Sequence, residues 1–282
     1  MKANSPSATA ERVAMRRAAH QVLDDPPVFN DPLALRIVGS AKAEALQAQT
    51  EPSERTPLSS YLRAFMAARS RFAEDQLALA VSNGTRQYVI LGAGLDTFAY
   101  RSTDEAVRVF EVDHPATQAW KRQRLAEVGI AVPPHLTFAP VDFETQTLAD
   151  GLRAAGFDTG LCTFFSWLGV TQYLTQEGVM ATLRFIASMP AGSAVVFDYG
   201  ISPSLLQPPQ RAAFDALARR VAAAGEPWRT FFDPAGLEAE LRALGFGQVE
   251  DTGPDALNAR YFKDRTDGLR VGSLTHLMYA RV

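Results

Sequence analysis

The chain has 282 residues, of which 47% are hydrophobic, and its formal net charge is -3 at pH 7. This length is sufficient for one large domain with a well-buried core. Because there is no excess of basic residues, composition gives no reason to expect binding to nucleic acid or to an anionic membrane. Cys162 is the only cysteine, which excludes an intramolecular disulfide and a zinc site built from several cysteines.

Targeting and metal-binding patterns are also missing from the sequence. The first 20 residues lack an apolar segment followed by a small-residue cleavage site, so no signal peptide is predicted. No apolar run approaches the length that spans a bilayer. The four histidines show no metal-ligand spacing. We therefore expect a soluble, cytoplasmic protein with no metal, no nucleic-acid partner and no membrane partner, and we leave its oligomeric state open.

Three helical segments are predicted before the first strand. Residues 9–23 have helical spacing of apolar side chains and stop at Asp24-Asp25-Pro26-Pro27. Asp31-Pro32 forms a cap and first-turn pair for a helix over residues 33–38. A longer helix covers residues 57–81 and ends at Ser82-Asn83-Gly84. This leader is predicted either to form a lid over a cleft or to pad the sheet.

Two short apolar runs follow, and each ends in residues suited to binding a nucleoside. Residues 88–91 lead directly into Gly92-Ala93-Gly94, and residues 107–110 lead into Glu111-Val112-Asp113. Apolar runs bounded by glycine are typical of parallel strands that are covered on both faces. Glycines at a strand end allow a tight turn and close approach of a ligand, and an acid about 20 residues later is suited to a ribose diol. The pair predicts a nucleoside cofactor on the first two strands.

The residues after the glycines favour one kind of cofactor. A dinucleotide fingerprint needs a small residue where Thr97 stands, and Asp96 would repel a pyrophosphate at the same helix start. That carboxylate suits a cofactor that carries a cation and a free ammonium. We therefore favour S-adenosylmethionine over nicotinamide or flavin dinucleotides.

The rest of the chain continues to alternate between helices and strands. This alternation predicts an α/β three-layer sandwich with a mostly parallel sheet. The predicted helices cover residues 117–128, 147–155, 175–189, 211–224 and 237–244, and the predicted strands cover residues 136–141, 161–165, 194–199, 247–251 and 274–282.

Four motifs in this pattern resemble the leucine carboxyl methyltransferase family: LGAGLDTFAYR, VFEVDHP, VDFET and WLGVTQYLT. The resemblance includes the family's bacterial branch of small-molecule O-methyltransferases in natural-product pathways. It implies a class I methyltransferase, with a Rossmann-like sheet of seven strands whose last hairpin holds the one antiparallel strand. On this basis residues 1–282 form a single domain, with a helical lid (1–84), a cofactor-binding core (85–200), an inserted acceptor segment (201–246) and C-terminal strands (247–282).

The resemblance also implies roles for individual residues around S-adenosylmethionine. A glycine loop passes under its methionine part, acids at the second strand hold its ribose, two residues flank its adenine, and an arginine pairs with its carboxylate. The matching residues are Gly92, Ala93 and Gly94; Asp113, with Glu111 as a second candidate; Asp142 and Phe143; and Arg69. Arg16 and Arg17 match a basic spot in the leader, and Arg17 is kept as a candidate for substrate binding.

One position departs from the family pattern. Relatives place a glutamate, suited to the cofactor's ammonium, before the glycine that follows the fourth strand. This chain has Leu168 there. Either Ser166 and backbone carbonyls take over the role, or cofactor binding is weaker or altered.

The acceptor site is predicted at the same edge of the sheet. Trp167 and Tyr199 are candidates to line it, whereas core packing is favoured for Tyr173. Phe214 and Trp228, in the segment inserted after the fifth strand, are expected to form an apolar wall. The predicted substrate is a small, largely apolar molecule methylated on a carboxyl or a hydroxyl group, and only a hydroxyl would need a general base. Two alternatives stay open: a non-methylating rearrangement or cyclisation around the bound cofactor, and a non-catalytic binding protein.

Overall fold

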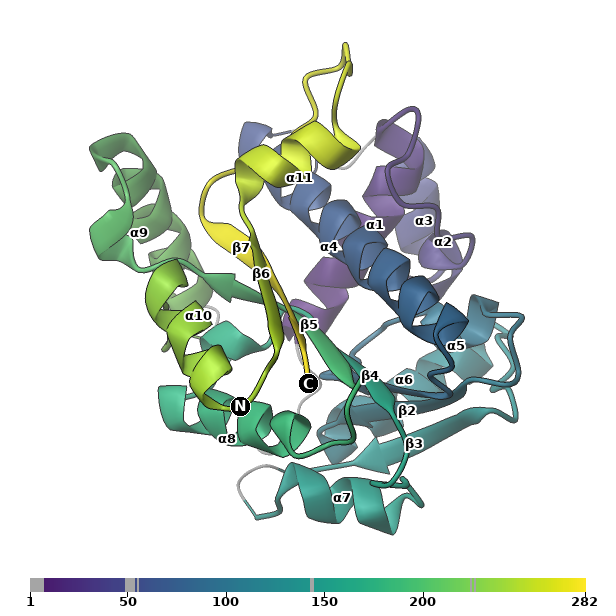
Figure 1. The fold of residues 1–282 in the computed structure, drawn as a ribbon. Helices are drawn as coiled ribbons and strands as arrows, with labels where there is room; N and C mark the ends of the chain where they lie inside the picture. Colours follow the sequence, from purple (N-terminus) through teal and green to yellow (C-terminus); the bar gives the residue numbers. More distant parts are fainter. Residues whose placement is uncertain (1–7, 49–53, 55, 143–144, 224, 226) are drawn as a thin grey trace.

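A computed structural model describes residues 8–48, 54, 56–142, 145–223, 225 and 227–282 (Figure 1). Seven strands form one sheet in the order β3-β2-β1-β4-β5-β7-β6. β7 runs antiparallel to both of its neighbours, and the other pairs are parallel, which confirms the predicted class of fold. The strands are β1 (Gln87–Leu91), β2 (Arg108–Asp113), β3 (Leu136–Pro140), β4 (Thr163–Trp167), β5 (Ala194–Gly200), β6 (Gln248–Thr252) and β7 (Thr275–Arg281).

Helices cover both faces of this sheet (Figure 1). They are α1 (Ala8–Leu23), α2 (Ala34–Ile37), α3 (Ser40–Gln47), α4 (Pro57–Ser82), α5 (Phe98–Arg101), α6 (Pro115–Glu127), α7 (Leu148–Ala154), α8 (Gln176–Ala187), α9 (Pro208–Ala223), α10 (Pro234–Ala243) and α11 (Pro254–Tyr261). Among the described residues, no helix is both long and apolar enough to cross a membrane.

The alternation of side chains along the strands produces two separate cores. Tyr88 and Ile90 of β1 point to one face, where they share a cluster with Phe72 of α4 and with α11. Val89 and Leu91 point to the other face, which α7, α8 and α10 cover. Every residue of β1, β4 and β5 is buried, as expected for strands covered on both sides.

The leader helices form a third apolar cluster, and buried charged side chains join them to one another and to the loop after β1. Arg63 of α4 forms a bidentate ion pair with Asp24, which follows the end of α1, with N···O distances of 2.7 and 2.8 Å. Arg17 of α1 donates to the backbone carbonyl of Leu95, beside the glycine loop, at 2.7 Å. α1 therefore lies across the carboxyl ends of the strands.

Several elements differ from the sequence prediction. α3 and α11 were not predicted because each buries a single side chain of its own, Leu46 and Leu257, and so has almost no apolar periodicity. α9 begins at Pro208 rather than at residue 211, and α10 begins at Pro234 rather than at residue 237. Proline fits the first turn of a helix, where its missing N–H has no partner to lose.

Candidate functional site

The loop after β1 requires glycine at two positions. Gly92 and Gly94 have φ values of +67° and +44°, a region that other residues rarely adopt. A Cβ atom on Gly92 would lie 2.4 Å from Cγ2 of Val170, and one on Gly94 would lie 3.0 Å from Cβ of Ala10 in α1. The loop is thus enclosed by the segment after β4 and by the start of α1.

Asp113 is joined directly to this loop. Its Oδ2 accepts from the backbone N–H of Gly94 at 2.6 Å, and its Oδ1 accepts from the N–H of His114 at 2.7 Å. Burial outweighs these hydrogen bonds and raises the pKa of the Asp113 carboxyl. The His114 ring accepts from Ala116 N–H and caps α6, so its role is structural. The structure therefore brings together a carboxylate and the glycine loop at the tip of β2.

Glu111 lies two residues before Asp113 on the same face of β2, and its carboxylate is paired within the protein. It is fully buried, it lies 2.7 Å from Nζ of the equally buried Lys121, and it accepts from the hydroxyl of Tyr100 at 3.2 Å. Burial raises the pKa of Glu111 to about 7, against the opposing effect of Lys121. The structure places Glu111 in a buried ion pair rather than at the loop.

This raised pKa predicts a pH dependence of stability. A carboxyl whose pKa is higher in the folded than in the unfolded chain takes up a proton on folding. The stabilisation that this proton gives the folded state is therefore complete below about pH 4.5 and is lost as the pH rises through about 7. We expect the free energy of unfolding of the wild type to fall between pH 5 and 8. The double variant Glu111→Gln/Lys121→Met, which leaves no unpaired cation, is expected to lack this slope. Urea denaturation at pH 5 and at pH 8 measures the free energy of unfolding of both proteins. An equal change with pH in the wild type and the double variant would contradict the assignment of the raised pKa to Glu111.

The two residues predicted beside the adenine follow β3. Asp142 is half-buried, and its backbone carbonyl accepts from the N–H groups of Thr145 and Gln146, forming a turn beyond the strand. Phe143 lies outside the described residues.

Arg69 and Asp198 meet at the carboxyl ends of β4 and β5. Nη1 of Arg69, in α4, lies 3.0 Å from Oδ2 of Asp198, and Oδ1 of Asp198 accepts from the backbone N–H of Gly169. Both side chains are almost fully buried. Gly169 has a φ of +77°, and a Cβ there would lie 2.9 Å from the Arg69 guanidinium, so only glycine leaves room for this pair.

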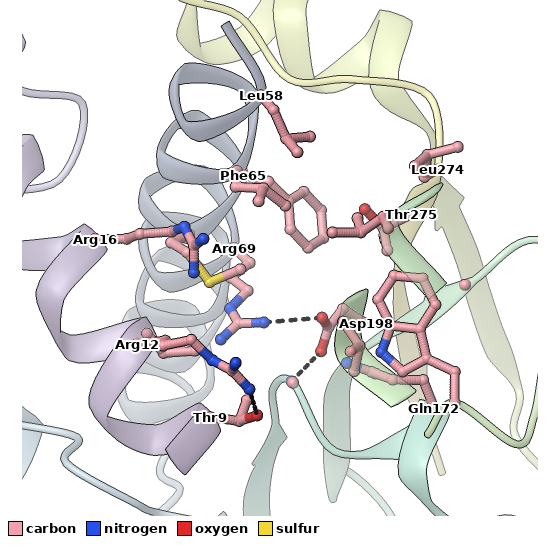
Figure 2. Close-up of a pocket in the computed structure, with 18 of the residues that line it drawn as sticks. Thr9, Arg12, Arg16, Leu58, Phe65, Arg69, Gln172, Asp198, Leu274 and Thr275 are labelled. Carbon is pink, nitrogen blue, oxygen red and sulfur yellow. Dashed lines mark hydrogen bonds and ion pairs between the residues drawn. The ribbon is translucent and has the colours of Figure 1, made fainter. Parts of the chain in front are cut away.

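The pair lies at a cavity of about 160 Å³ between α1, α4, α9 and the ends of β4 and β5. Figure 2 shows Arg12, Arg16 and Arg69 on one side of it and Asp198 and Gln172 on the other. Phe214, Trp228 and Phe231 form an aromatic wall, with ring centroids 5.1 to 6.3 Å apart. The cavity therefore combines an apolar wall with several guanidinium groups.

Three polar atoms at this cavity are buried without a hydrogen-bond partner in the described part of the chain. They are Nε of Arg16, Oε1 of Gln172 and Nε1 of Trp228. Burial also lowers the pKa of Arg16, against the opposing effect of Glu54. Buried polar groups are normally paired, so these atoms are available to hydrogen-bond a polar ligand.

Of the predicted site residues, Arg69, Phe214 and Trp228 line this cavity, whereas the glycine loop, Asp113 and Asp142 lie outside its lining. Four other predicted residues point elsewhere. The Ser166 hydroxyl lies 2.7 Å from the hydroxyl of Tyr88 within the core, and Trp167 packs in the core on the other face of the sheet. Tyr199 is fully buried and donates to Asp251 at 2.7 Å, because it points to the face opposite Asp198. Arg17 lies about 100° around α1 from Arg16 and points to Leu95 and Asp31 instead.

Several residues that line the cavity were not among those predicted, including Asp198, Gln172, Arg12 and Phe231, and Arg16 was named only beside Arg17. Tyr173, for which core packing was favoured, also lines it. Two signals were available. Asp198 is a carboxylate near the carboxyl end of a buried parallel strand, the feature that singled out Asp113. Arg12 and Arg16 are four residues apart and therefore share one face of α1.

The strand order, the antiparallel β7, the glycine loop and the acid at the tip of β2 together define a class I, S-adenosylmethionine-dependent methyltransferase. The model of the family described as "Leucine carboxyl methyltransferase" matches residues 10–187. The chain belongs to the leucine carboxyl methyltransferase family.

Relatives and solved structures agree with this placement. A Bacillus subtilis (strain 168) protein named "Putative S-adenosyl-L-methionine-dependent methyltransferase YktD" is 32% identical, over 99% of each chain. A Mycolicibacterium gilvum (strain PYR-GCK) protein named "Putative S-adenosyl-L-methionine-dependent methyltransferase" is 30% identical, over 92% of this chain and 84% of its own. A crystal structure titled as a putative methyltransferase from Thermobifida fusca has the same fold, with a TM-score of 0.57 at 18% identity, over 98% of this chain and 95% of its own.

The residues present fit S-adenosylmethionine. A carboxylate at the tip of β2 suits the ribose hydroxyls, and the loop beside it carries no Cβ at Gly92 and Gly94. The cavity offers both a guanidinium and a carboxylate to an amino-acid group. No group of three or more His, Cys, Asp or Glu residues that could hold a metal ion occurs among the residues placed by the structure.

Proposed function

We propose that this protein is an O-methyltransferase that methylates a carboxyl group of a small, largely apolar organic acid in natural-product metabolism. The observation that carries the proposal is a cavity with an aromatic wall and guanidinium groups beside the cofactor-binding edge of the sheet. Arginine side chains are suited to hold a carboxylate, and the aromatic wall suits an apolar body. The natural-product role rests on the resemblance to the bacterial branch of the family.

The titratable groups at the cavity favour a carboxyl over a hydroxyl acceptor. Among the described lining residues the only carboxylate is Asp198, which pairs with Arg69, and there is no histidine or lysine. An alcohol or phenol would need a general base within hydrogen-bond reach. A carboxylate is already ionised at neutral pH and needs none. The site thus supports an acceptor that arrives as an anion.

In the proposed mechanism, the protein positions the reactants and excludes water. When bound, S-adenosylmethionine supplies an electrophilic methyl group on a sulfonium. Asp113 would hold the ribose, Asp142 would contact the adenine, and Arg69 would pair with the carboxylate of the cofactor. Phe214, Trp228 and Phe231 enclose the acceptor, and Arg16 orients its carboxylate. Positioning of this kind can lower a barrier by about 7–11 kcal/mol in well-oriented systems.

An acceptor screen tests the reaction. The purified protein is incubated with S-adenosylmethionine and matched sets of aromatic and aliphatic carboxylic acids, phenols and alcohols, and mass spectrometry detects a gain of one methylene unit. Methyl esters from the acids are expected. Methyl ethers alone would move the assignment to a hydroxyl acceptor. Cofactor binding without methylated product from a broad panel would favour the rearrangement or binding-protein alternatives.

Truncating the aromatic wall is expected to impair use of the acceptor selectively. Phe214→Ala and Trp228→Ala each remove an aromatic side chain from the cavity, so we expect KM for the acceptor to rise about tenfold or more while the Kd for S-adenosylhomocysteine stays within about twofold. Leu205→Ala, an exposed position outside the cavity, serves as the control. Unchanged acceptor kinetics in both wall variants would show that α9 and the loop after it are not part of the acceptor site.

A further inference from the structure

Asp198 is not among the residues proposed above to contact the cofactor or the acceptor. Side chains alternate along β5, so Ala194 and Val196 point toward α4, and Asp198 follows them at the strand's carboxyl end. Asp198 is 1% exposed, yet it lines the cavity. Burying a carboxylate costs free energy unless cations or hydrogen-bond donors contact it, so the burial of Asp198 at a ligand cavity requires an explanation.

The surrounding contacts hold this carboxylate in one orientation. Arg69 and the N–H of Gly169 each donate to one of its oxygens, and the Thr171 hydroxyl donates to the Asp198 backbone carbonyl at 2.6 Å. Asp198 is also the only hydrogen-bond partner of the Arg69 guanidinium among the described residues. The site therefore presents one fixed anion and one fixed cation, side by side, to the cavity (Figure 2).

This arrangement complements the amino-acid end of S-adenosylmethionine. That end carries an ammonium and a carboxylate on the same carbon, so a site for it needs an anion and a cation next to each other. Asp198 is the only carboxylate among the described residues that line the cavity. Leu168, the residue before Gly169, is apolar and packs against the α4 side of the core. The segment after β4 thus contributes no charge of its own at that position.

We propose that Asp198 binds the ammonium of S-adenosylmethionine while its partner Arg69 binds the carboxylate. The two side chains form a clamp in which the bound amino-acid group completes a ring of alternating charges. Charge-assisted hydrogen bonds at such a buried site are stronger than neutral ones and fix the orientation of the ligand. The proposal depends on the identity of the cofactor and not on the identity of the acceptor.

The test measures ligand affinity by isothermal titration calorimetry, without any acceptor. Asp198→Asn is expected to raise the Kd for S-adenosylhomocysteine about 10- to 100-fold. The Kd for 5′-methylthioadenosine, which lacks the amino-acid end, is expected to stay within about twofold. Asp251→Asn is the control, because Asp251 is a hydrogen-bonded carboxylate of the same sheet that contacts His276 and Tyr199 away from the cavity.

A second measurement uses the wild type and does not depend on how well any variant folds. An S-adenosylhomocysteine analogue that lacks only the amino group is expected to bind the wild type about 10- to 100-fold more weakly than S-adenosylhomocysteine itself. Asp198→Asn is then expected to weaken binding of this analogue little further. Equal losses for S-adenosylhomocysteine and 5′-methylthioadenosine would show a purely structural role for Asp198. Full affinity of the wild type for the analogue would overturn the clamp.

Discussion

Asp113→Ala is expected to raise the Kd for S-adenosylhomocysteine about 100-fold or more. Asp113 is the proposed acceptor for the ribose hydroxyls, and hydrogen bonds to a charged group contribute about 1.5–3 kcal/mol each. The same carboxylate also fixes the glycine loop through the N–H of Gly94, so the variant loses both a ligand contact and the order of the loop. Isothermal titration calorimetry measures the change in Kd. Asp113→Asn keeps one acceptor oxygen, so its Kd is expected to lie between those of the wild type and Asp113→Ala.

Asp158→Ala is the matched control for this prediction. Asp158 is an exposed aspartate in the loop before β4 and therefore lies at the opposite edge of the parallel sheet. Its replacement is expected to leave the Kd unchanged. If both aspartate variants bound the cofactor as tightly as the wild type, the ribose site would have to lie away from β2.

Arg63→Met is expected to lower the free energy of unfolding by about 3–5 kcal/mol, because it leaves the buried carboxylate of Asp24 without its cation. Arg63 and Asp24 are each 5% exposed, and Arg63 also donates to the backbone carbonyl of Glu54 at 2.7 Å. Burial acts to raise the pKa of Asp24, but the hydrogen bonds from Arg63 and His20 prevail and lower it. The stabilisation is therefore present above about pH 4 and is lost on acidification. Urea denaturation at pH 7 measures the loss.

Two further variants show whether the buried charge is the cause. Arg71→Met removes an exposed arginine of the same helix, paired with Asp75, and is expected to change stability by less than about 1 kcal/mol. Adding Asp24→Asn to Arg63→Met removes the unpaired charge and is expected to restore part of the loss. A loss no larger for Arg63→Met than for Arg71→Met would show that this pair does not fix α1 to α4.

Several features of the fold could be predicted from the sequence because they depend on local pattern. Apolar runs of four to six residues, most of them followed by glycine or an acid, identified the parallel strands, and the family motifs supplied the antiparallel β7. The glycine loop and Asp113 followed from the same pattern, and the structure joins them by a hydrogen bond. The short helices α3 and α11 could not be predicted in this way, since one buried side chain in eight residues leaves no period to detect.

The sequence alone determined that this chain forms a doubly wound α/β sheet and that Gly92, Gly94 and Asp113 lie at one edge of it, because strand period, glycine and strand-end acids are local signals. Only the tertiary structure decided which side chains share the cavity. Asp198 and Tyr199 are adjacent in sequence but point to opposite faces of β5, and Arg16 and Arg17 point to different sides of α1. Arg69 and Asp198 are 129 residues apart, and they meet because α4 crosses the end of β5. Contacts of this kind depend on how distant elements pack, which no local pattern encodes.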